Sequence, residues 1–153
     1  MKKVEEMENL GRTRWMIDNS NEYSLEELLK EIKTQKSVPD ILLTALGEKD
    51  MSVEVMSQLA GLARATGYKI VNNKMRPEAD ILIRIAFVLD FSVEEMQQLL
   101  KSGRRSMLSG NHKRDVVIIY GRSNGLSLGE MDLLLEEYGL PVLVPPLKEK
   151  KNR

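Results

Sequence analysis

The stretch Met51–Pro77, MSVEVMSQLAGLARATGYKIVNNKMRP, decides the fold. Its pattern predicts a short helix over Val53–Ala60, a turn at Gly61, a second helix over Arg64–Val71 and a loop that ends at Pro77. Two helices that meet at roughly a right angle across a short, glycine-containing turn form the unit that places its second helix in the major groove of DNA. The stretch therefore predicts a DNA-binding helix-turn-helix.

The outward face of the second helix is expected to be polar and partly cationic, because Leu59, Leu62 and Ile70 are expected to face the core. Arginine and lysine donate to guanine or phosphate, asparagine pairs with adenine or phosphate, and tyrosine donates to phosphate or stacks. The candidate DNA-binding residues are Arg64, Ala65, Tyr68, Lys69 and Asn72 on the helix, and Asn73, Lys74 and Arg76 in the loop.

Length and composition suit one globular domain, since 42% of the 153 residues are apolar and 30% are charged. No cysteine is present, which excludes disulfides and thiol catalysis and favours a reducing compartment. The longest apolar runs are far shorter than the roughly 20 residues that cross a bilayer, and Met1–Leu10 is too acidic for a signal peptide. We therefore expect a cytoplasmic protein without a membrane span.

The formal net charge is zero, whereas nucleic-acid-binding domains are commonly basic. Between Ala60 and Arg114, however, ten basic residues stand against five acidic ones. A local surplus of this kind suits contacts to DNA phosphates. The surplus includes Arg84. It also includes basic residues between predicted helices, which either contact phosphates or form a solvated surface: Lys101, Arg104, Arg105, Lys113 and Arg114.

Helix-start signals recur along the chain. Ser24 opens an amphipathic pattern with Glu27 at the third helical position, and its apolar face is Leu25, Leu28, Leu29 and Ile32. Ser52, Ser92 and Ser127 begin three similar segments, which place Met56, Met96 and Met131 at the same position. Their irregular spacing favours ordinary start signals of an all-α domain over stacked repeats.

Other segments also predict helices. In the first segment Val4, Met7 and Leu10 form one stripe, and Trp15 is expected to pack against other side chains. Further helices are predicted over Val38–Leu46, ending at Gly47, over residues 78–90, over Val93–Leu100 and over Val116–Ser123. The β-branched run in the last of these suits a strand, but it has no partner strand. The final helix runs from Ser127 to Tyr138, and Gly139, Pro141, Pro145 and Pro146 predict an extended, frayed tail.

These features resemble the lambda-repressor-like, or Cro-type, helix-turn-helix family. The resemblance covers about Ser37–Leu100 and rests on Ala60-Gly61, Leu62, Ile70, the loop over residues 72–77, residues 81–86, Leu89 and residues 92–95. It implies an all-α fold with a five-helix DNA-binding core whose second and third helices read the DNA, commonly as a dimer on an operator. Residues 114–139 are similar to a C-terminal helical hairpin of some regulators of Gram-positive bacteria.

The expected organisation has four parts. A helical extension occupies residues 1–36 and the helix-turn-helix core occupies residues 37–103. A helical hairpin occupies residues 104–141 and a basic tail occupies residues 142–153.

Three positions depart from the family pattern. Ala63 stands where a capping Ser, Thr or Asp is usual, and Gly67 lies inside the second helix, where a β-branched core residue is common. A missing cap costs about 1 kcal/mol and an interior glycine about 0.5–1 kcal/mol, so this helix is expected to be soft unless DNA or a partner orders it. Asn73 replaces the usual loop glycine, and asparagine accepts a left-handed backbone conformation.

No pattern for catalysis or metal binding is present. His112 is the only histidine and has no cysteine or second histidine with which to share a metal. The pairs Glu94-Glu95 and Glu136-Glu137 are adjacent on helices and diverge, which makes them poor acid/base pairs. We therefore expect neither an enzyme nor a bound cofactor or metal.

Two functional hypotheses follow. The first is a sequence-specific DNA-binding transcriptional regulator that acts on double-stranded DNA, with a homodimer as its expected form. The second is a degenerate helix-turn-helix that acts as a protein–protein interaction module. In that case the partner binds the C-terminal hairpin, where Asp132, Glu136 and Glu137 lie beside Leu133, Leu134 and Leu135.

Overall fold

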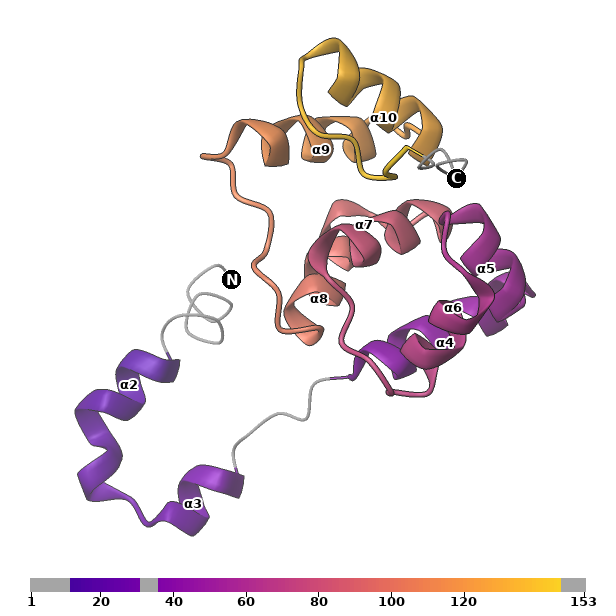
Figure 1. Ribbon diagram of the computed structural model, residues 1–153. Coiled ribbons are helices and arrows are strands. Elements are labelled where there is room, and N and C mark those ends of the chain that lie inside the picture. Colours follow the sequence, from indigo (N-terminus) through magenta and orange to yellow (C-terminus); the bar gives the residue numbers. More distant parts are fainter. Residues whose placement is uncertain (1–11, 31–35, 147–153) are drawn as a thin grey trace, which may run out of the picture. The chain divides into compact units, whose positions relative to one another are not determined.

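The computed structural model describes residues 12–30 and 36–146, and every regular element in these two ranges is helical (Figure 1). The chain divides into two compact units, residues 1–35 and residues 36–153. The all-α prediction is therefore confirmed for the part of the chain that the structure describes.

The first unit contains α2 (Arg12–Asn19), a 3-10 turn (Ser20–Glu22) and α3 (Leu25–Lys30). Trp15 packs against Tyr23, with ring centroids 5.2 Å apart, as its size requires. The Ser24 hydroxyl accepts from the Glu27 amide and the Glu27 carboxylate accepts from the Ser24 amide, which confirms the predicted cap. Of the predicted apolar face, Leu28 is buried, whereas Leu25 and Leu29 are exposed.

Two predictions for the first unit fall outside the described residues. These are the stripe within Met1–Leu10 and the contribution of Ile32.

The second unit is built from helices that are short and mostly capped by serine. Ser37, Ser52, Ser92 and Ser127 each accept a hydrogen bond from an amide of the first turn, which satisfies one of the donors that a helix start leaves unpaired. The helices are α4 (Val38–Lys49), α5 (Val53–Leu59), α6 (Arg64–Val71), α7 (Ala79–Val88), α8 (Val93–Ser102), α9 (Lys113–Ser123) and α10 (Leu128–Glu137).

Helix α7 lies at the centre of this unit, and α5, α8 and α10 all pack against it. Its residues Leu82–Phe87 are all buried, so the helix is covered on nearly every side. Met56, Met96 and Met131, the equivalent methionines of the three serine-capped segments, are fully buried in the same core. The shared start pattern therefore serves to place one flexible apolar side chain of each helix in a common centre.

Two details of the predicted helices are wrong. Helix α4 does not end at Gly47 but continues to Lys49, and Asp50 adopts the left-handed conformation that ends it (φ 52°). Leu59, expected in the core, is 56% exposed, and Ala60 takes the fully buried position at the end of α5. Because the chain turns directly after α5, the last side chain of this segment to face the core is that of Ala60 and not that of Leu59.

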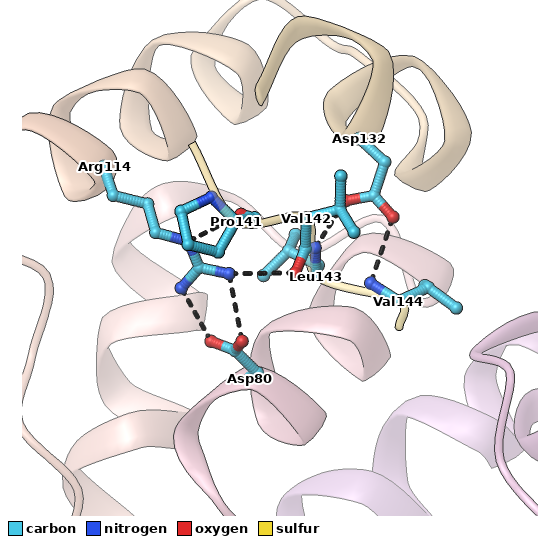
Figure 2. A network of polar contacts seen from close by, with 7 residues as sticks. All are labelled: Asp80, Arg114, Asp132, Pro141, Val142, Leu143 and Val144. Atoms are coloured by element: carbon cyan, nitrogen blue, oxygen red, sulfur yellow. Dashed lines mark hydrogen bonds and ion pairs between the residues drawn. The ribbon is translucent and has the colours of Figure 1, made fainter. Parts of the chain in front are cut away.

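The segment Pro141–Pro146 is not a frayed tail but a strap that is bound to the helices. Leu143 is 1% exposed and belongs to the core. The amides of Leu143 and Val144 both donate to the carboxylate of Asp132 on α10, at 2.6 Å and 3.0 Å (Figure 2). The predicted basic tail over residues 142–153 therefore begins with docked apolar residues, while residues 147–153 lie outside the described range.

Arg114 of α9 ties the strap to α7. Its guanidinium forms a two-pronged ion pair with Asp80 of α7, at 2.9 Å and 3.0 Å, and also donates to the carbonyls of Pro141 and Val142 (Figure 2). Arg114 was a candidate for phosphate contact, but its donors are occupied within the protein.

We expect Asp132→Asn to lower the stability of the second unit by about 1–3 kcal/mol, because the amide offers only one acceptor oxygen to two backbone donors. Thermal unfolding followed by circular dichroism measures the loss. The matched control is Glu136→Gln, which neutralises an exposed acid on the same helix and should leave the melting temperature within about 1 °C. Equal melting temperatures for the two variants would contradict this role of Asp132.

Candidate nucleic-acid interface

The predicted turn between α5 and α6 is present. Helix α5 ends at Leu59 with Ala60 as its C-cap, Gly61 has a left-handed backbone (φ 69°), and α6 begins at Arg64. The amide of Leu62 donates to the carbonyl of Ser57 at 2.8 Å, which closes the turn. Glycine adopts this φ without a steric penalty, so Gly61 allows the chain to change direction within the four residues between α5 and α6.

Gly67 has a packing role in α6. A Cβ added at this position would lie 1.8 Å from the hydroxyl oxygen and 3.0 Å from the Cβ of Ser57 on α5. Ser57 is buried, and its hydroxyl donates to the carbonyl of Val53 at 2.7 Å. The glycine that lowers the intrinsic helix propensity of α6 is thus what lets α6 lie directly against α5.

Arg84 of α7 fixes the turn from inside. It is 6% exposed, and its guanidinium donates to the carbonyls of Ala60 (2.9 Å) and Gly61 (2.8 Å). Burial lowers the pKa of Arg84, and the negative charges of Asp80 and Asp132 oppose this shift. Arg84 was counted in the local charge surplus, but it adds nothing to the surface charge, because its guanidinium is buried and bonded to the turn.

The predicted reading face of α6 is exposed as a group. Ile70 and Val71 face the core, and the exposed residues are Arg64, Ala65, Tyr68, Lys69, Asn72, Asn73 and Lys74. Asn73 has φ 57°, the left-handed conformation expected at the position where the Cro-type pattern usually has glycine. Ala63 lies at the N-cap and makes no side-chain cap bond, as its chemistry predicts.

Arg76 differs from the other predicted site residues. Its guanidinium donates to the carbonyl of Gly103 at 3.0 Å and to that of Arg104, so it closes the loop onto the end of α8. Arg105 donates to the carbonyl of Pro77 at 2.8 Å. Two of the arginines that were expected to contact phosphates thus direct part of their guanidinium donors to backbone carbonyls of this chain.

Glu54 of α5 is a residue of the site that the sequence did not single out. One carboxylate oxygen, Oε1, accepts from the Tyr68 hydroxyl at 2.9 Å and lies 3.1 Å from Nη2 of Arg64. The Arg64 guanidinium also lies over the Tyr68 ring, 5.7 Å from its centroid. In the sequence Glu54 looks like an ordinary acid of a first helical turn, and only the packing of α5 on α6 brings it to the reading face.

The described residues contain neither a metal site nor a membrane-spanning helix. Residues 12–30 and 36–146 contain no group of three or more His, Cys, Asp or Glu side chains that are placed to hold a metal. His112 lies at the N-cap of α9 and is exposed. Among the helices that the structure describes, none is long and apolar enough to cross a membrane.

The geometry defines a class of protein domain: a buried central helix supports two short helices at a glycine turn, and the second of them exposes a cationic polar face. Residues 42–99 match the Cro/C1-type helix-turn-helix DNA-binding domain. This match confirms the resemblance of this part of the chain to the Cro-type helix-turn-helix family. No curated protein and no solved structure gives a significant match to the chain.

We expect Gly67→Ala to destabilise the domain by about 1–3 kcal/mol although alanine favours helix, because the added methyl overlaps Ser57. Chemical denaturation measures the change. The matched control is Gly47→Ala, in the interior of α4, where an added Cβ meets nothing within 4 Å. That substitution should stabilise the domain by about 0.4–1 kcal/mol. Ser57→Ala should lessen the cost of Gly67→Ala, and equal costs in both backgrounds would contradict the overlap.

Proposed function

We propose that the protein is a sequence-specific DNA-binding transcriptional regulator that inserts α6 into the major groove. The observation that carries this proposal is the exposed face of α6, on which Arg64, Tyr68, Lys69 and Asn72 stand together while Ile70 and Val71 are buried. The match of residues 42–99 to the Cro/C1-type DNA-binding family supports the same conclusion.

Each residue of the face has a chemical role in the proposal. Arg64 is the first residue of α6, and the first residues of a recognition helix are those that reach base edges. Its guanidinium suits the two acceptors of guanine, and Asn72 suits adenine or a phosphate. Ala65 offers a methyl group to thymine, and Tyr68, whose hydroxyl donates to Glu54, offers its ring for apolar contact with the DNA.

The loop after α6 supplies the phosphate contacts. Lys74 and Asn73 are exposed directly after the helix, and Lys69 lies in its last turn. Arg76 contributes by holding this loop against α8, a positioning role that follows from its bonds to the Gly103 and Arg104 carbonyls. We assign the contacts with DNA to Arg64, Ala65, Tyr68, Lys69, Asn72, Asn73 and Lys74.

Binding to duplex DNA is expected to weaken with salt, but less steeply than in strongly basic proteins. Each phosphate contact changes the slope of log affinity against log salt by about −0.9, so two or three contacts per protomer predict about −2 to −3. Fluorescence anisotropy with a duplex selected from a random library measures this slope. Absence of duplex binding at about 50 mM salt would overturn the proposal.

The double substitution Arg64→Ala and Lys69→Ala is expected to weaken binding to the selected duplex by about 30-fold or more, because it removes one base contact and one phosphate contact. The charge-matched control is Lys36→Ala with Lys49→Ala, two exposed lysines outside α6. The control should change affinity much less than the α6 variant. Equal effects would show that net charge, and not the face of α6, controls binding.

We also infer that two copies bind one operator. Exposed apolar side chains on the hairpin, Val116, Tyr120 and Leu133, support a contact with another protein surface, including a second copy. The expected selected sequence is a pseudo-palindrome whose half-sites lie about 34–36 Å apart, one turn of the duplex. Selection of a single asymmetric site, with one protein bound per duplex, would contradict the two-copy arrangement.

A further inference from the structure

We propose that Glu54 is a specificity-determining residue, which holds Arg64 and Tyr68 in place for base recognition and opposes binding to DNA of arbitrary sequence. This inference rests on the proposed function and assigns a role to a residue that lies on α5, outside the recognition helix. Glu54 is the second residue of α5, beside the start of α6.

The contacts of Glu54 converge on one oxygen. Oε1 receives the Tyr68 hydroxyl at 2.9 Å and the Arg64 guanidinium at 3.1 Å. Arg64 in turn lies over the Tyr68 ring. The three side chains therefore form a closed set in which each one contacts the other two, and the position of Arg64 at the start of α6 is defined from two sides.

The exposure of these side chains indicates that their contacts contribute little to the stability of the fold. The side chains of Arg64 and Glu54 are 71% and 48% exposed, and ion pairs in water contribute little to folding. No described contact buries the set, so its carboxylate remains at the surface that approaches DNA. A negative charge at that position is unfavourable beside phosphates unless it is compensated locally.

Compensation depends on the base sequence. With a guanine within reach, Arg64 can donate to both guanine acceptors while its remaining donors stay with Glu54, because guanidinium carries five donors in a rigid fork. On an unrelated sequence the same arginine gains only by turning to a phosphate, which breaks the pair and leaves the carboxylate beside the backbone. Glu54 thus disfavours the phosphate contact of Arg64 more than its guanine contact.

Glu54→Gln tests this directly, because glutamine keeps the size and an acceptor for Tyr68 but removes the charge. The matched control is Glu94→Gln, an exposed acid on α8. Anisotropy titrations across a salt series use two probes for all three proteins: the duplex selected by the wild-type protein, and an unrelated duplex of equal length. Repeating the library selection with Glu54→Gln provides a second measurement.

Glu54→Gln is expected to bind the unrelated duplex about five- to tenfold more tightly and the selected duplex no better. The ratio of the two affinities then falls about five- to tenfold, the effect of one good base contact. The salt slope on the unrelated duplex becomes steeper by about one phosphate contact, as Arg64 turns to the backbone. Its selected sequences show a weaker preference at the position that Arg64 reads, whereas Glu94→Gln behaves like the wild type.

The outcomes separate this inference from the proposed function. If the wild-type protein discriminates between the two duplexes and Glu54→Gln keeps the same ratio, the role of Glu54 is refuted while the function stands. An equal gain on both duplexes also refutes it, since that is a general charge effect. If the wild-type protein binds neither duplex, the proposed function and this inference both fail.

Discussion

The two carbonyl groups at the end of α5 are held by one buried arginine, and the geometry of the helix-turn-helix depends on that contact. Arg84 donates to both Ala60 and Gly61, whose carbonyls would otherwise end a helix inside the protein without a full set of partners. Burying a guanidinium costs free energy, and the negative charges of Asp80 and Asp132 offset part of that cost by favouring the charged form. Since Arg84 belongs to α7, the turn is fixed to the most buried helix of the unit. Gly67 then sets how closely α6 lies against α5, so the reading face is placed by the core rather than by its own weak helix propensity.

The fold was largely predictable because its signals are local. Serine caps, left-handed positions at Gly61, Gly125 and Asn73, and apolar residues at helical intervals each act within a few residues of the chain. The predicted limits of α6 agree with the structure, and α9 is a helix despite its β-branched run. The errors concern the ends of elements and the segment after α10. Leu143 and Val144 lie outside any helical pattern in the sequence. Their amides donate to Asp132 on α10, a contact between two elements that no local pattern predicts.

The exposure of the α6 face was predictable from the sequence, but the charge available around it was not. Exposure of the α6 face follows from which residues the core takes, and the sequence shows that pattern. The sequence does not show which cationic side chains remain available to contact DNA, because an arginine can donate equally well to backbone carbonyls and to solvent. Arg76, Arg84, Arg105 and Arg114, four of the ten basic residues in the local surplus, donate to carbonyls of this chain, so fewer cations are available for a phosphate path than the sequence indicates. The same reasoning explains why Glu54 was missed: its partners Arg64 and Tyr68 are distant along the sequence and meet it only through helix packing.

The contacts of α7 also show that the DNA-binding domain and the C-terminal hairpin form one unit. The family match covers residues 42–99, yet the core continues through Ile118, Met131, Leu135 and Leu143. A helix buried along the whole of Leu82–Phe87 needs cover on more sides than α5 and α8 supply, and α10 packs against it as well. The strap extends this cover to the turn itself, because a side-chain carbon of Val144 would lie 3.1 Å from a Cβ at Gly61. The residues beyond the matched range are therefore part of what holds α5 and α6 in place, and the hairpin is a structural component of the site it adjoins.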